Sequence, residues 1–150
     1  MEASVQEFAT AFAAATGEPP PQQAFAFGDS PELADELAAL VLAGPKRATA
    51  ALHADFGHRD DEVPRPGELA VVLDGSWAPV CVIRTVTVEV APFSTVDAAF
   101  AWDEGEGDRS LDYWIAAHER FFRRRCEALG LEFSTDLEVV FERFELVWSG

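Results

Sequence analysis

One lysine and one threonine have the residue types and spacing for acid–base or nucleophilic chemistry. Lys46 is the only lysine among 11 basic residues, and it lies three positions before Thr49, directly after the break Gly44–Pro45. A lysine that loses its proton can act as a base or activate a hydroxyl, whereas an arginine stays charged. The two side chains can meet only if the backbone turns at Arg47–Ala48, because residues three apart in an extended chain point to opposite faces. The alternative, which spacing alone favours, is an exposed lysine before an ordinary strand threonine.

The segment Asp103–Asp108 offers a second set of reactive groups, because it contains four carboxylates and two glycines. Carboxylates on a flexible loop can supply a general acid or base, or they can bind a hard cation. The spacing of an EF-hand is absent, so we predict neither a metal ion nor another cofactor. The alternative is a solvated loop before a helix, in which Asp108 or Ser110 is the N-cap.

Basic residues cluster in one segment, at Arg120 and Arg123–Arg125. On the helix predicted there, the only tyrosine, Tyr113, lies off the apolar stripe and near Arg120 and Arg124. Such a cluster can contact phosphate, or it can complement the negative end of the helix and cover neighbouring side chains. The sequence alone favours the second interpretation.

The histidines and cysteines do not show a metal-binding pattern. His118 falls within the apolar stripe of the same helix, so we predict a buried or pocket-lining histidine. His53 and His58 lie near acids in one loop, at a spacing that fits no zinc site. Cys81 and Cys126 lie in separate apolar segments, and we predict reduced core residues instead of a disulfide.

The overall charge argues against a protein that grips a nucleic-acid backbone. The chain has 27 acidic and 11 basic residues, for a net charge of −16, and phosphate contacts need a basic surface. A small or nearly neutral substrate fits this field better, although acidity that serves only solubility is the alternative. No apolar run is long enough to cross a membrane, and the acidic N-terminus lacks the features of a signal peptide. We therefore expect a cytoplasmic protein with no membrane partner.

The elements that must position these residues follow from periodicity, caps and breakers. The patterns predict helices at 4–15, 31–43, 95–100 and 111–129. They predict strands at 47–53, 68–74, 80–90 and 138–148. Ser30 and Ser94 are the expected N-caps of the second and third helices, residues 53–67 form a loop, and a bulge is expected near Arg143. Clean βαβ alternation is missing, so we predict an α+β fold with a small curved sheet or barrel flanked by helices.

The chain divides into two parts in this interpretation. Residues 1–22 form a helix and a Pro-rich linker, because Pro19–Pro21 follow the first helical pattern. Residues 23–150 form one domain, whose length and hydrophobic content suffice for a core.

Four segments of the sequence resemble the bacterial ASCH-domain proteins. They are FGDSPELADELAALVLAGPKRATA at 27–50, PGELAVVLDG at 66–75, residues 81–122 and the terminal VVFERFELVW. The resemblance covers roughly residues 25–148. The central motif of the family, G-x-K-x-x-T, is matched by Gly44, Lys46 and Thr49, and the block EGEGDRSL-x-YW is a second match. The resemblance implies a PUA-like β-barrel with helices beside it, and a cleft into which the G-x-K-x-x-T loop projects.

The resemblance also implies a role connected with RNA or nucleosides. Some members look like amidohydrolases that remove the acetyl group from N4-acetylcytidine with a lysine, a threonine and a glutamate, and others look like ribonucleases. The lysine and threonine carry over to Lys46 and Thr49. The glutamate is either Glu104 or Glu106, and the choice stays open because this chain has a longer insert than the compact amidohydrolases.

The leading hypothesis is a hydrolase of an acylated nucleoside or related amide that needs no metal. Lys46, with a pKa lowered by the pocket, takes the proton of Thr49, whose oxygen attacks the acyl carbonyl. Glu104 or Glu106 orients Lys46 or protonates the leaving amine. The residues expected to bind the substrate are Phe27, Gly44, Arg47, Trp102, Ser110, Tyr113, Arg120 and Arg124.

Two other functions stay open. The same cleft could bind an RNA end or a modified base, with Lys46 and the helix arginines on phosphate and Phe27 or Trp102 stacked on a base. A ribonuclease is a variant of this second hypothesis. The third hypothesis is an interaction domain without catalysis. A lined pocket that holds Lys46, Thr49 and a glutamate would favour the enzyme, whereas an open basic groove would favour RNA.

Overall fold

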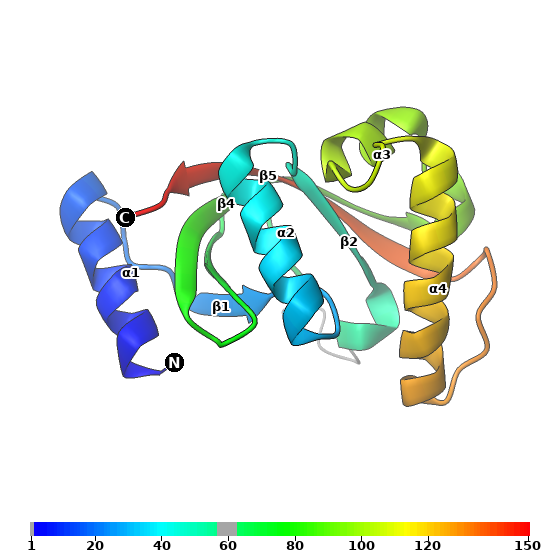
Figure 1. Ribbon diagram of the computed structural model, residues 1–150, viewed down its shortest axis with the longest axis horizontal. Helices are drawn as coiled ribbons and strands as arrows, with labels where there is room; N and C mark the ends of the chain where they lie inside the picture. Colours follow the sequence, from blue (N-terminus) through cyan, green and yellow to red (C-terminus); the bar gives the residue numbers. More distant parts are fainter. Residues whose placement is uncertain (1, 57–62) are drawn as a thin grey trace.

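The fold combines a curved five-stranded sheet with four α-helices in the computed structural model, which describes residues 2–56 and 63–150 (Figure 1). The helices are α1 (Ala3–Thr16), α2 (Pro31–Ala43), α3 (Ala98–Glu104) and α4 (Leu111–Leu129). The strands are β1 (Gln23–Ala26), β2 (Ala48–Leu52), β3 (Leu69–Leu73), β4 (Pro79–Pro92) and β5 (Glu138–Trp148). Two short 3-10 helices, η1 (His53–Phe56) and η3 (Phe93–Thr95), follow β2 and β4.

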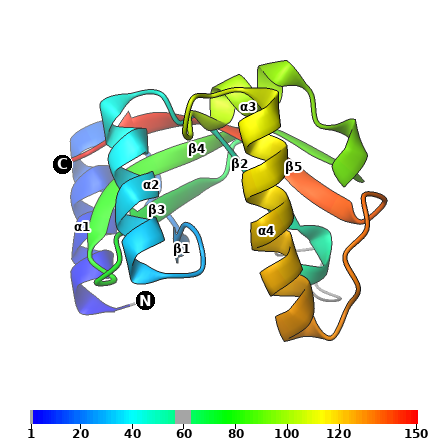
Figure 2. The same cartoon turned by 45° about the vertical axis from the view of Figure 1, so that its right-hand side comes forward.

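The sheet is mixed, with the strand order β1-β3-β4-β5-β2. β1 runs parallel to β3, and all other neighbouring strands are antiparallel. The long strands β4 and β5 pair from Val82 opposite Trp148 to Pro92 opposite Glu138, and they carry the sheet into a half-barrel (Figures 1 and 2). This arrangement confirms the predicted α+β, PUA-like fold, in which helices flank a small barrel-like sheet.

Helix α1 lies at the opposite end of the molecule from α4 (Figure 1). Its buried residues Val5, Ala9 and Phe12 form one apolar cluster with Val71 of β3 and Val82 of β4. α1 therefore shares a core with the sheet. The division of the chain into two parts at residue 22 stays a prediction.

Helices α2 and α4 face each other across a space that residues of both helices line, and β2 is visible between them in Figure 1. Val41 of α2 is buried in a cluster with Phe27 and Phe144, whereas Trp114 and Phe122 of α4 are buried in a different cluster. Each helix is therefore anchored by its own apolar cluster. The space between the two helices does not have to be filled by apolar side chains and can hold polar ones.

The three longer predicted helices and all four predicted strands are present. Their caps act as expected: the Ser30 hydroxyl accepts a hydrogen bond from the Leu33 backbone N–H, and the Ser110 hydroxyl accepts one from Tyr113. Gly130, in the left-handed region with φ 73°, ends α4. Of the two N-caps considered for α4, the structure uses Ser110.

Two predictions about helix α3 and the bulge are wrong in detail. The N-cap of α3 is Asp97, whose carboxylate accepts from the Phe100 N–H, and not Ser94, because η3 occupies the residues after β4. The helix continues to Glu104, so the acidic loop begins only at Gly105. The bulge near Arg143 lies on the opposite strand, where the register of β4 shifts between Thr85 and Thr87.

Strand β1 was not predicted as a strand, since the four residues QAFA are too short a run to establish alternation; Gln23 is exposed and the other three are half-buried. The predicted 53–67 loop begins as η1, and His58 lies outside the described residues. Cys81 and Cys126 are both free and buried, which confirms the expected reduced core residues. Among the described residues, none of the helices has the length and apolar character to span a membrane.

Candidate functional site

Lys46 is buried in the short segment that connects α2 to β2. Gly44 ends α2 with φ 116°, and its backbone N–H binds the Leu40 carbonyl. The Arg47 N–H then binds the Asp103 carbonyl at 2.7 Å, which docks the loop on the end of α3. As a result Lys46 points inward, and only 1% of it is exposed.

The Lys46 ammonium group has an acceptor for each of its three N–H donors. Nζ lies 2.8 Å from the Ala48 carbonyl oxygen, 3.3 Å from Glu104 Oε1 and 3.1 Å from Glu106 Oε2. It also lies 5.3 Å from the centre of the Phe27 ring. The lysine is therefore neither exposed nor ordinary, and both candidate glutamates contact it.

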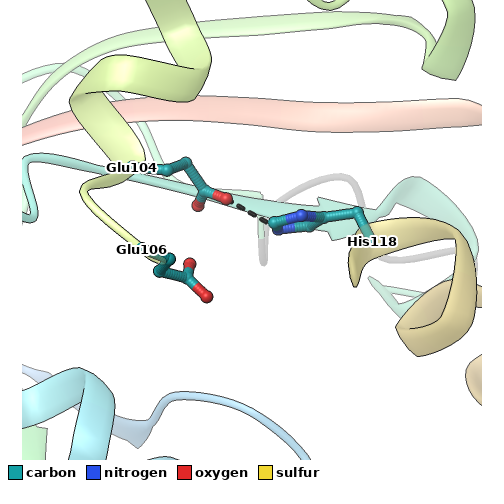
Figure 3. Close-up of side chains that lie close together, drawn as sticks. All are labelled: Glu104, Glu106 and His118. Atoms are coloured by element: carbon teal, nitrogen blue, oxygen red, sulfur yellow. Dashed lines mark ion pairs between the residues drawn. The ribbon is translucent and has the colours of Figure 1, made fainter. Parts of the chain in front are cut away.

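Glu104 is the centre of a second set of contacts (Figure 3). Its Oε2 lies 2.6 Å from both Trp114 Nε1 and His118 Nε2. The other ring nitrogen of His118 lies 2.9 Å from the Trp114 carbonyl oxygen, and the two rings stack with centroids 3.9 Å apart. Because both nitrogens of His118 face acceptors, the geometry suits a protonated imidazolium. The prediction of a buried histidine in the pocket wall is confirmed.

The charges set the protonation of these groups. Burial alone would lower the pKa of the Lys46 amine, but the charges of Glu104 and Glu106 outweigh burial and raise that pKa. Burial would raise the pKa of Glu104, but Lys46 and His118 hold it well below its usual value. Burial lowers the pKa of His118, and the charge of Glu104 more than offsets this and raises it. The expected lowered pKa of Lys46 is therefore wrong for the site at rest.

Glu106 differs from Glu104 because it is partly exposed to the cavity, with 18% of its side chain accessible. Burial and the neighbouring charge of Glu104 raise its pKa, and Lys46 offsets only part of this effect. Two neighbouring carboxylates whose pKa values are pushed apart are typical of acid–base sites. Glu104 suits a permanent negative charge, and Glu106 suits a group that gains and loses a proton.

Gly105 joins the two sequence motifs. It has φ 70° at the end of α3, and a Cβ atom added there would collide with the backbone of Pro45. Gly107 has φ 58° and lies directly against the Tyr113 ring. The acidic segment can therefore approach the loop that contains Pro45 and Lys46, and also α4, only because glycine stands at both positions.

These groups line a cavity of about 220 Å³ between α2, β2 and α4. The residues predicted for the site that border it are Phe27, Lys46, Thr49, Glu104, Glu106, Tyr113, Arg120 and Arg124. The Thr49 hydroxyl has no hydrogen-bond partner among the residues that the structure describes. It is therefore available to a ligand in the cavity.

Four other residues expected at the site do not border this cavity. Gly44 ends α2 and Ser110 begins α4. The Arg47 guanidinium donates to the carbonyl groups of Val41 and Lys46, so it holds the loop. Trp102 is 55% exposed and stacks with Arg109.

The arginines of α4 do not form an open basic groove. Arg124 binds Asp29 at 2.9 Å, and Arg125 binds Asp55 at 2.6 Å. Arg123 binds Glu119 at 2.9 Å. Of the cluster, only Arg120 has no acidic partner within the described residues, and it lies at the cavity.

Oxygen and nitrogen atoms of Glu104, Glu106 and His118 lie within 4.8 Å of one another, which is a spacing that could hold a metal ion. Lys46 Nζ already lies between the two carboxylates. A divalent cation at this point would therefore have to displace the lysine ammonium.

Two residues of the site were not predicted from the sequence as partners of a glutamate. Trp114 and His118 both bind Glu104 Oε2, and they lie four residues apart on α4. That spacing places them on one helix face, which is the signal that could have linked them. Their glutamate, however, comes from a different element.

Comparisons with known proteins agree with the resemblance seen in the sequence. The family model of the ASCH domain matches residues 23–148. The crystal structure of an ASCH domain from Lactobacillus crispatus JV V101 is 33% identical, with a TM-score of 0.90, and the alignment covers 99% of this chain and 96% of that one.

A protein of Enterococcus faecalis V583 with a solved structure is 32% identical, with a TM-score of 0.89, and the alignment covers 99% of this chain and 91% of that one. A comparison with curated proteins gave no match. The family match covers most of the chain and coincides with the segments that build the fold and the cavity. The chain therefore belongs to the ASCH-domain family.

Proposed function

We propose that this ASCH domain is a hydrolase that cleaves the amide bond of an acylated nucleoside or a related small amide. One observation carries the proposal: Lys46, 1% exposed, contacts two carboxylates in a cavity that Thr49 also lines. Burying such a pair costs desolvation free energy, and well-packed apolar residues would often be at least as stable. Perturbed ionisable groups that converge on a cavity favour a catalytic role.

In the proposed reaction, Thr49 Oγ1 attacks the acyl carbon, and the carbonyl π electrons move to oxygen. The Thr49 proton passes to Lys46 while Lys46 passes one of its own protons to Glu106, 3.1 Å away. Lys46 thus remains an ammonium ion, which agrees with its raised pKa. This route requires the Thr49 hydroxyl to contact the Lys46 amine, and both groups border the cavity.

The tetrahedral intermediate then collapses and breaks the C–N bond. The nitrogen leaves as a neutral amine after it takes the proton from Glu106. Water then attacks the Thr49 ester, and its proton passes through Lys46 to Glu106. Glu106 returns this proton to the Thr49 oxygen as the C–O bond of the ester breaks and the carboxylic acid is released. An arginine at position 46 could not relay the proton, because its guanidinium does not deprotonate in proteins.

Glu104, Trp114 and His118 serve as positioning residues in this scheme. Glu104 fixes Lys46 through Oε1, and the donors on its Oε2 hold the carboxylate in place. Its lowered pKa keeps it ionised while Glu106 changes protonation.

The test is turnover of N4-acetylcytidine and related amides by the full chain, followed by chromatography of cytidine and acetate. We expect Thr49→Ala, Lys46→Arg and Glu106→Gln each to slow turnover by about 100-fold or more. Matched controls are Thr10→Ala on the exposed face of α1 and Glu127→Gln on α4, which should keep wild-type rates. No turnover of any acyl nucleoside, or full activity of Lys46→Arg, would refute the proposal.

RNA is the second candidate partner, because ASCH domains are generally linked to RNA binding. The geometry supports it less well. Lys46 is too deeply buried to reach a phosphate outside the cavity, and three arginines of α4 are paired with acids. A small substrate that enters the cavity agrees better with both facts.

A further inference from the structure

A second, larger cavity adjoins the pocket of Lys46. Its volume is about 810 Å³, against about 220 Å³ for the pocket. Thr49, Phe27 and Phe121 border both cavities. The threonine expected to act as nucleophile therefore stands where the two spaces meet.

Glu142 supplies a buried carboxyl group to the larger cavity. The residue is 7% exposed, and its Oε2 accepts a hydrogen bond of 2.7 Å from the Thr85 hydroxyl. No other hydrogen bond to the Glu142 side chain exists among the described residues, so Oε1 is left for a ligand.

Glu142 and Thr49 are direct cross-strand partners on β5 and β2. Side chains of directly paired residues point to the same face of a sheet, with Cβ atoms about 4.5–5.5 Å apart. A group that Thr49 attacks is therefore within reach of Glu142 as well.

We infer that the substrate lies across Thr49, with its acyl group in the smaller cavity and its amine portion in the larger one, where Glu142 accepts a hydrogen from the scissile amide nitrogen. The inference rests on the proposed function for the identity of the bond at Thr49. It assigns Glu142 as a specificity-determining residue. A carboxyl group can accept an N–H whether it is ionised or protonated.

The walls of the larger cavity define the chemical class of the amine portion. Aromatic side chains suit a flat ring, and they are Phe25, Phe27, Phe56 and Phe121. The charged lining is mostly acidic, and it consists of Asp29, Asp55, Glu68, Glu142 and Arg125. Arg125 is itself bound to Asp55. The cavity therefore suits a nucleoside that carries an exocyclic amine, and it disfavours a phosphorylated one.

The test is direct binding of products to the wild-type chain by calorimetry at low salt, with cytidine, uridine and cytidine 5′-monophosphate as probes. Uridine has a carbonyl oxygen where cytidine has its amine. We expect cytidine to bind about 10-fold more tightly than uridine and than the monophosphate. Equal binding of uridine, or tighter binding of the monophosphate, would overturn the inference.

The variant Glu142→Gln adds a second measurement. A glutamine amide can turn to donate or to accept, so the preference for cytidine over uridine should fall to within about 3-fold. Glu127→Gln, exposed on α4, should keep the wild-type preference. An unchanged preference in a folded Glu142→Gln would refute the role of Glu142, and if this variant does not fold, the wild-type comparison decides.

The outcome is separable from that of the proposed hydrolysis. Selective cytidine binding without turnover would uphold the subsite and remove the hydrolase. Turnover of N4-acetylcytidine without the preference for cytidine would uphold the hydrolase and remove the subsite.

Discussion

The protonation state of Lys46 determines how the pocket can work. A buried amine without partners would lose its proton easily, but Glu104 and Glu106 reverse this effect. The lysine at rest is an ion held by two carboxylates, and it can accept a proton only as it gives one away. This is a narrower role than that of a free base, and it requires Glu106 to be the receiving group.

The pKa of Lys46 can be measured directly, because the chain has no other lysine. In protein labelled with ¹³C-lysine, we expect a single side-chain signal that titrates above the usual pKa of a lysine. The variant Glu106→Gln should lower this pKa, since it removes one opposite charge and leaves the burial. A wild-type signal that titrates in the neutral range would contradict the assigned ion pair and favour a free base.

His118 should make folding stability depend on pH. Its pKa is raised in the folded chain, so the stability it contributes is complete below the unfolded value of about 6.5 and is lost as pH rises through the folded value. His118→Gln keeps a donor but does not titrate. We expect the advantage of wild type over this variant, measured by urea unfolding, to shrink as the pH rises above about 6.5. An advantage that grows over this range would mean that the folded imidazole is neutral.

The end of α3 is held against the lysine loop by the absence of a side chain at Gly105. We expect Gly105→Ala to lower the free energy of unfolding by about 2–4 kcal/mol, through a strained φ and a collision with Pro45. Gly17→Ala is the matched control, because Gly17 ends α1 with φ 77° and has open space around it. That change should cost only about 1 kcal/mol. Equal costs in denaturant titrations would mean that the contact with Pro45 is unimportant.

Most elements could be predicted from local patterns, and the exceptions have physical causes. Helix α4 has a long apolar stripe between Ser110 and Gly130, so its bounds followed from the sequence. The start of α3 did not, because Ser94 and Asp97 are equally good caps and only the η3 turn decides between them. Strand β1 is short, and its pairing with β3 depends on residues far along the chain.

Most residues of the candidate site could be identified from the sequence, but their charge interactions could not. Lys46, Thr49 and the acidic segment were all identified from the sequence. The sign of the pKa shift of Lys46 was not, because its partners lie 58 and 60 residues farther along the chain. Glu142 was missed for the same reason, since its position opposite Thr49 depends on the register of β2 with β5.

The charge of the whole molecule limits what it can bind. With 27 acids and 11 bases, and the arginines of α4 largely paired, we expect no general affinity for a nucleic-acid backbone. Fluorescence anisotropy with a mixed-sequence single-stranded RNA at about 150 mM salt should give a Kd weaker than about 100 µM. Tight binding with a steep dependence on salt would contradict this expectation, because such a slope counts displaced counterions.

The burial of the only lysine also makes the protein a reporter of its own opening. The Lys46 amine is held by three acceptors and 1% of the residue is exposed, so a reagent that acylates lysine amines should react with it only when these contacts open. The rate at which the peptide containing Lys46 gains the mass of the acyl group would therefore report how often the surroundings of this one residue open. Any ligand that binds in the cavity should lower the rate of Lys46 acylation.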